Sequence, residues 1–179
     1  MRIAIVVVLA GALAGAWAQD IKLPPSFDKL AAKAENSVDV TLDGSMLQLA
    51  GKFLSDKEAD EAKAKSLIGG LKSIYVRSFE FAKEGEYDSA DVESIRAQLK
   101  APEWSRVVGV KSKREGDNAE VYLKTSGGTQ IGGLVVIAAE PKELTIVSII
   151  GSISPEDLAS LGGQFGIPKV DVPKSKGKE

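Results

Sequence analysis

The side chains that could do chemistry in this chain are carboxylates, amines, guanidinium groups and hydroxyls. The sequence contains no cysteine and no histidine, which excludes thiol nucleophiles, cysteine-based zinc sites, disulfides and histidine-based triads. Carboxylates occur as close pairs at three places: Asp88 and Asp91, Glu140 and Glu143, and Glu156 and Asp157. A glycosidase needs two carboxyl groups facing each other across a cleft, whereas local pairs at helix starts are typical of caps and helix-dipole partners. The residue types therefore argue against an enzyme. We predict no catalytic residue, metal ligand or cofactor.

Cationic residues gather on two consecutive segments between residues 106 and 124. They are Arg106, Lys111, Lys113, Arg114 and Lys124. Alternation along a strand puts Lys111 and Lys113 on the same side, where they could meet an anionic ligand or an envelope surface. The competing interpretation, which we favour, is a solvated sheet edge at which lysine also prevents edge-to-edge pairing.

Aromatic residues form a third candidate group. Its members are Tyr75, Phe79, Phe81, Tyr87 and Trp104. Such a set could line a ligand pocket, although aromatic side chains are more often ordinary core. Tyr75 and Trp104, together with the five basic residues, make up the candidate surface for a ligand or a partner.

The helices that would position these residues follow from the spacing of apolar side chains. This spacing predicts helices over residues 27–34, 46–54, 59–71 and 92–99, since apolar residues recur there every three or four positions. Asp43 is expected to cap the second helix, and Asp88 or Ser89 the fourth. Residues 55–58 have the pattern of a capping box before the third. A further helix is predicted to start at Ser154.

Strands are predicted over residues 38–42, 73–81, 106–114, 119–124, 130–139 and 144–153, where β-branched and aromatic residues are bounded by turn residues. The short links among the last four strands predict an antiparallel meander. Helices mainly in the first half and strands mainly in the second predict an α+β fold. We expect a largely antiparallel sheet packed with several helices in a single domain.

The last two predicted strands are apolar on both sides. On the final strand, one side carries Leu144, Ile146 and Ile150, and the other carries Val147, Ile149 and Ile153. On the strand before it, one side carries Leu134 and Val136, and the other carries Ile131, Val135 and Ile137. Because a half-exposed antiparallel strand would show polar residues on one side, both faces must be covered. We expect the helices over 46–54, 59–71 and 92–99 on one face, and a terminal helix or a second protein on the other.

The first 18 residues have the pattern of a secretory signal peptide. Arg2 precedes an apolar run over residues 3–14, and Ala16 and Ala18 are the small residues that signal peptidase needs. Cleavage would leave Gln19 as the first residue, with one domain over 19–168 and a disordered, lysine-rich tail over 169–179. We predict an exported protein, periplasmic or secreted. No transmembrane helix is expected after cleavage, and no lipid anchor, because the chain has no cysteine to carry one.

Three long stretches of the chain resemble a known bacterial family. They are LPPSFDKLAAKAENSVDVTLDGSML, SIYVRSFEFAKEGEYDSADVESIRAQLKAPEWSRVVGVKSK and GGLVVIAAEPKELTIVSIIGSISPEDLASLGGQFGIP. Together they resemble the family catalogued as domain of unknown function 4252, over roughly residues 23–168. The resemblance implies a small exported envelope protein, and the missing cysteine sets this chain apart from members with a lipoprotein signal. That family has no established activity, so the resemblance assigns no catalytic residue.

Three functions remain open from the sequence. The net charge of −2, from 23 Lys and Arg against 25 Asp and Glu, argues against a nucleic-acid partner. Our first hypothesis is a non-enzymatic envelope protein, a regulatory or accessory component that binds another protein or itself. The alternatives are an anion- or lipid-binding module that uses the basic and aromatic residues and, as the weakest, a carboxylate-based hydrolase. A flat apolar patch would favour the first, a deep cavity under Tyr75 and Trp104 the second, and convergent carboxylates from distant segments the third.

Overall fold

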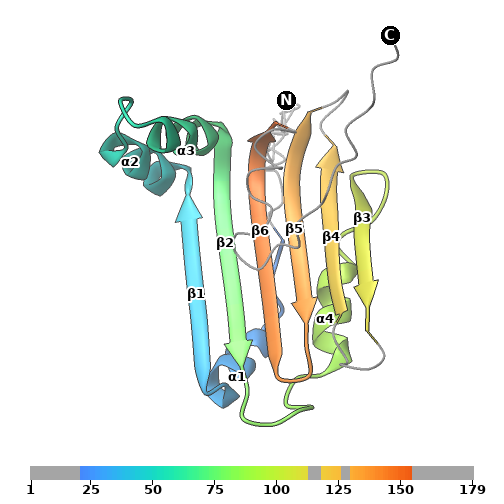
Figure 1. Ribbon diagram of the computed structural model, residues 1–179. Coiled ribbons are helices and arrows are strands. Elements are labelled where there is room, and N and C mark those ends of the chain that lie inside the picture. The colour runs from blue at the N-terminus through green and yellow to red at the C-terminus, as the bar shows by residue number, and fades with distance from the viewer. Residues whose placement is uncertain (1–20, 113–117, 126–129, 155–179) are drawn as a thin grey trace, which may run out of the picture.

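The computed structural model describes residues 21–112, 118–125 and 130–154. This part of the chain forms one compact arrangement of helices and strands (Figure 1). In chain order the elements are α1 (Ser26–Lys33), β1 (Asn36–Asp43), α2 (Gly44–Phe53), α3 (Ala59–Gly70), β2 (Leu71–Glu80), α4 (Ser89–Arg96), β3 (Trp104–Lys111), β4 (Asn118–Thr125), β5 (Ile131–Ala139) and β6 (Glu143–Ile153). The predicted α+β class and single domain are confirmed.

All six strands join one open antiparallel sheet. Their order across the sheet is β1-β2-β6-β5-β4-β3, and every neighbouring pair is antiparallel. The four strands from β3 to β6 are neighbours in chain order, which confirms the predicted meander. β1 and β2 continue the sheet on the other side of β6, so β1 and β3 are its two edges.

The central strands β5 and β6 are apolar on both faces, and each face of the sheet has its own pair of helices. One face, here the α1/α4 face, packs against Phe27 and Leu30 of α1 and against Val92 and Ile95 of α4. The opposite face, the α2/α3 face, packs against Leu47 of α2 and against side chains of α3. Figure 1 shows α2 and α3 at the upper end beside β1 and β2, and α4 behind β4. The alternation predicted for β6 is confirmed: Leu144, Ile146 and Ile150 lie on the α1/α4 face, and Val147, Ile149 and Ile153 lie on the other.

The expected position of the fourth helix was wrong. We predicted residues 92–99 on the same face as the helices over 46–54 and 59–71. Instead, Val92, Ile95 and Leu99 pack on the α1/α4 face, opposite α2 and α3. Helical spacing shows that α4 has an apolar side but carries no information on which sheet face that side will cover.

The side assigned to Ile131 was also wrong. A β-bulge interrupts the pairing of β5 between Ile131 and Gly133. The extra residue reverses the alternation, so Ile131 packs on the α2/α3 face, whereas Val135 and Ile137 lie on the α1/α4 face. Strict period-two counting fails wherever a bulge intervenes.

Two of the predicted helix caps are present, and the third does not form. The Asp43 carboxylate accepts a hydrogen bond from the Met46 backbone N–H at 2.9 Å at the start of α2. At α4, the Asp91 carboxylate accepts one from the Asp88 N–H at 3.2 Å, which gives this acidic pair a structural role. The capping box at residues 55–58 does not form, because α3 begins only at Ala59; the Glu61 carboxylate instead accepts the Ser55 N–H at 2.7 Å.

The junction between α3 and β2 passes very close to β6. Gly151 of β6 has a φ of +146°, and a Cβ placed there would lie 2.5 Å from both the Gly70 carbonyl oxygen and the Leu71 Cα. Only a residue without a side chain fits this crossing. Gly151 therefore sets how closely the α3–β2 segment approaches the sheet.

Several sequence predictions fall outside the described residues. These are the signal segment 1–18, Lys113, Arg114, the pair Glu156 and Asp157, the helix predicted after Ser154, and the tail 169–179.

Candidate functional site

The basic residues of the β3–β4 hairpin that the structure describes all lie on the α1/α4 face. Arg106 pairs with Tyr122 and Val108 pairs with Val121, so Val107 is an extra residue that forms a bulge. Without this bulge, Arg106 and Lys111 would lie on opposite faces, because they are five positions apart. With it, both line the same groove beside α4.

Lys124 lies on the same face, but beside Trp104 and Glu103 at the start of β3. Its ammonium nitrogen is 5.7 Å from the centre of the Trp104 ring and 3.3 Å from the Glu103 carboxylate. These contacts tie Lys124 to the start of β3 and leave it outside the lining of the groove.

The groove consists of two adjoining cavities between α4 and the β3–β4 hairpin. One has a volume of about 450 Å³ and is lined by Arg96, Arg106, Lys111 and Glu120, among others. The other, of about 340 Å³, shares Arg96 and Lys111 with it and extends toward Tyr87 and Pro141. The cations thus line both parts of the groove, and the second part adds apolar side chains such as Val92 and Pro141.

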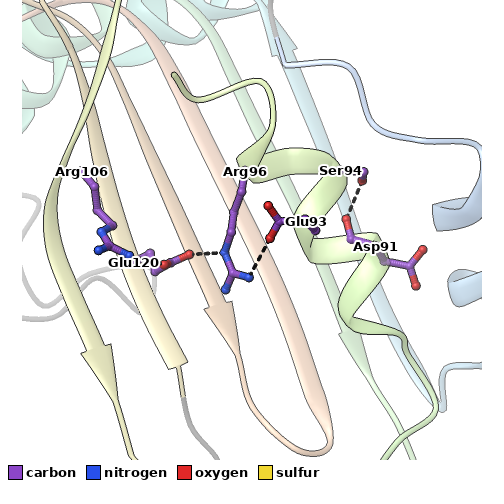
Figure 2. A network of polar contacts seen from close by, with 6 residues as sticks. All are labelled: Asp91, Glu93, Ser94, Arg96, Arg106 and Glu120. Carbon is purple, nitrogen blue, oxygen red and sulfur yellow. Dashed lines mark hydrogen bonds and ion pairs between the residues drawn. The ribbon is translucent and has the colours of Figure 1, made fainter. Parts of the chain in front are cut away.

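A buried carboxylate holds the two arginines of this groove (Figure 2). The Glu120 side chain is only 10% exposed. It accepts a hydrogen bond from Arg96 Nε at 2.6 Å and one from Arg106 Nη1 at 2.9 Å. Arg96 also contacts the Glu93 carboxylate on its own helix at 3.4 Å. The network joins α4 to β4 and to the edge strand β3.

The protonation state of Glu120 follows from these contacts. Burial acts to raise the pKa of Glu120, but the hydrogen bonds and charges of Arg96 and Arg106 outweigh it and leave the pKa lowered. Glu120 is therefore ionised at neutral pH. A carboxylate in this state serves as a counter-ion and does not fit the role of a general acid.

Tyr75 and Trp104 lie on the same sheet face but do not share a cavity. Four strand spacings separate β2 from β3, which amounts to about 19 Å across the sheet, since neighbouring strands lie about 4.8 Å from each other. Trp104 is buried. Burial, followed by the charge of Asp28, raises the pKa of Tyr75 to about 12, so its hydroxyl stays protonated.

Tyr75 lines a separate cavity of about 380 Å³ near α1, and two carboxylates from distant segments, Asp28 and Asp39, line it as well. Arg77 forms an ion pair with Asp39 and stacks over the Tyr75 ring at 4.4 Å. A cation paired with one of the two carboxylates does not match the acid and base pair of a hydrolase.

Among the described residues, the most exposed large apolar side chain, Phe53, lies on α2 with two further exposed apolar residues. Met46 and Leu49 are each 50% exposed and Phe53 is 82% exposed, and their spacing puts them on one side of the helix. We call these three residues the α2 stripe. The same helix buries Leu47 against the sheet, so α2 is apolar on both sides. Among the described residues, no helix is long and apolar enough to cross a membrane.

Three features of these surfaces were not predicted from the sequence. Arg96 and Glu120 were not among the expected site residues, although a carboxylate between Ala119 and Val121 in an apolar strand is a visible signal. The exposure of Met46, Leu49 and Phe53 is the third, because helical spacing alone does not separate the buried apolar residues of α2 from the exposed ones.

Comparison with known proteins identifies the family and nothing narrower. No curated protein and no solved structure matches the chain. The family described as "Domain of unknown function (DUF4252)" matches residues 29–161, which is well over half of the chain and includes both α4 and the β3–β4 hairpin. The chain therefore belongs to the DUF4252 family.

Proposed function

We propose that this chain is an exported, non-enzymatic protein of the cell envelope that works by binding another protein. The observation that carries this proposal is the α2 stripe. Single exposed apolar residues are common on protein surfaces, but three on one side of one helix form a continuous apolar strip, and such patches mark interaction sites. The capped start of α2, where Asp43 accepts the Met46 N–H, holds the strip in place.

The geometry of the strip indicates how a partner would bind. Met46, Leu49 and Phe53 have the spacing of the anchors with which an amphipathic helix occupies an apolar groove. Leu47, on the other side of the helix, is 1% exposed and anchors α2 to its own sheet. The partner therefore needs an apolar groove or patch of its own, and a second copy of this chain is the alternative partner.

Replacing the outermost residue of the strip tests this role. Phe53→Asp is expected to abolish recovery of a specific partner from the envelope, because a charge would enter an apolar contact. Its thermal melting should stay close to that of the wild type, since Phe53 is 82% exposed. Gln48→Asp is the matched control, because it adds the same charge at an exposed position of the same helix.

The readout separates the two kinds of partner. Cross-linking in cells identifies a second protein, and light scattering of the purified chain detects self-association. If Phe53→Asp and Gln48→Asp retain the same cross-links and the same oligomeric state as the wild type, the stripe is not a binding surface and the proposal fails.

Export is tested by the mass of the mature protein. The arrangement of Arg2, the apolar run over 3–14 and the small residues Ala16 and Ala18 supports cleavage before Gln19. We expect intact-mass measurement of the protein from the periplasm or medium to give a chain that begins at Gln19. Exported protein that still carries Met1 would contradict this.

A further inference from the structure

We propose that the groove between α4 and the β3–β4 hairpin binds an organic anion, with Arg96, Arg106 and Lys111 contacting its carboxylate or phosphate group. This site lies on the α1/α4 face, whereas α2 packs on the opposite face. It is thus separate from the α2 stripe, and the two proposals can fail independently.

The charges around the groove are unbalanced. Three cations, Arg96, Arg106 and Lys111, line the larger cavity together with one carboxylate, Glu120. Glu93 contacts Arg96 from the rim at 3.4 Å and is mostly exposed. Lys111 forms no ion pair with any residue that the structure describes. The cavity therefore has a net positive charge even when Glu120 and Glu93 are counted against the three cations. A net positive charge attracts an anion.

Buried Glu120 fixes the two guanidinium groups before a ligand arrives. Each oxygen of the carboxylate accepts from a different arginine, at 2.6 Å from Arg96 and at 2.9 Å from Arg106. A guanidinium has five N–H donors in a planar fork that matches carboxylate and phosphate oxygens. Held in place by Glu120, these forks lose less conformational entropy when they bind an anion.

A purely structural role accounts for Arg96 better than for Arg106. Arg96 ties α4 to the sheet, but Arg106 belongs to an edge strand and its side chain is 58% exposed. The Arg106 side chain passes over Gly109 to reach Glu120. A Cβ added at Gly109 would lie 3.6 Å from the guanidinium carbon of Arg106. The Val107 bulge places Arg106 on this face. The groove thus presents an exposed cation beside Lys111.

The adjoining cavity determines what kind of anion fits. Tyr87, Val92, Ala139 and Pro141 line it together with the polar residues Ser89 and Asn118, so it offers some apolar surface beside polar groups and the cations. An anion with an apolar body would place its charged group at Arg106 and Lys111 and its body against these side chains. We therefore expect an aromatic or aliphatic carboxylate or phosphate to bind better than inorganic phosphate.

The test uses the full chain as exported and four probes: benzoate, phenyl phosphate, inorganic phosphate and neutral benzyl alcohol. Calorimetric titration at low salt should give saturable binding of phenyl phosphate or benzoate, weaker binding of inorganic phosphate, and none of benzyl alcohol. Binding should weaken as salt is added, because the charges are partly exposed. Absence of saturable binding for both organic anions, together with no retention on the anionic vesicles described below, overturns the proposal.

Variants locate the site. Arg106→Gln and Lys111→Gln are each expected to weaken binding about tenfold, the effect of losing one charge-assisted hydrogen bond. Lys124→Gln is the matched control, because it removes a cation from the same hairpin and the same face but outside the groove; it should change affinity less than about twofold.

Lys111→Gln removes no ion pair that the structure describes, so it tests binding even if Arg106→Gln unfolds. Equal losses in Lys111→Gln and Lys124→Gln would show a nonspecific charge effect and overturn the proposal.

A vesicle-binding experiment distinguishes a lipid headgroup from a soluble anion as the ligand. Vesicles of phosphatidylglycerol and of phosphatidylcholine are sedimented with the wild type and with Lys111→Gln. Retention only on phosphatidylglycerol, lost in Lys111→Gln, assigns the site to an anionic lipid headgroup. Phenyl phosphate binding without vesicle binding assigns it to a soluble anion. A protein that binds neither the vesicles nor the soluble anions has no anion site in this groove.

Discussion

Gly151→Ala is expected to destabilise the fold by about 3 kcal/mol, from backbone strain and overpacking together. The φ of +146° is one that residues with a side chain rarely adopt. The new Cβ would also lie 2.5 Å from the Gly70 oxygen and from the Leu71 Cα. Both contacts are with backbone, so relief requires the α3–β2 junction to move away from β6. Urea unfolding of the purified chain measures the loss.

Gly69→Ala is the matched control for this prediction. Gly69 lies in α3, and an added Cβ would have no atom within 4 Å beyond its chain neighbours and the nearby backbone of its own helix. Alanine favours a helix over glycine by up to about 1 kcal/mol, so Gly69→Ala should leave stability unchanged or raise it. If Gly151→Ala and Gly69→Ala gave the same denaturant midpoint, the close approach at Gly151 would not be a constraint on the fold.

Glu120→Gln is expected to cost about 2–3 kcal/mol of stability, because it removes the charged acceptor that Arg96 and Arg106 share in a buried position. Glu93→Gln is the control. It removes a mostly exposed partner of Arg96 at 3.4 Å, and such contacts contribute less than about 1 kcal/mol. Equal stability losses in the two variants would show that the Glu120 network does not hold α4 to the sheet.

The same residue predicts a pH dependence. The folded-state pKa of Glu120 is lowered: burial opposes the shift, and the two arginines outweigh it. Ionised Glu120 therefore stabilises the fold above the ordinary pKa of a glutamate, and this contribution is lost as pH falls through the lowered, folded-state value. The stability gap between wild type and Glu120→Gln should be widest at neutral pH and should narrow on acidification. A gap that is constant from neutral to acidic pH would contradict the assignment.

The local features of this protein could be predicted from its sequence. The alternation of Leu144, Ile146 and Ile150 with Val147, Ile149 and Ile153 predicted a β6 buried on both faces, and the structure confirms it. The caps at Asp43 and Asp88 were predicted from residue type, because a short polar side chain before an apolar helix satisfies exposed N–H groups. The short links from β3 to β6 predicted the meander, since neighbouring antiparallel strands need only tight connections.

How these elements combine into a site depends on contacts between segments that are far apart in the chain. The bulges at Val107 and at Gly132 reverse the alternation, and a bulge is defined by pairing with another strand, which a single segment cannot reveal. The Glu120 network joins Arg96, 24 positions away, to Arg106, 14 positions away. Which side of α2 is covered, and so why Phe53 is exposed while Leu47 is buried, also depends on the face that the helix packs against. The periodicity of the sequence shows which side chains lie on the same side of a helix or strand. Whether that side contacts another element or solvent depends on tertiary packing.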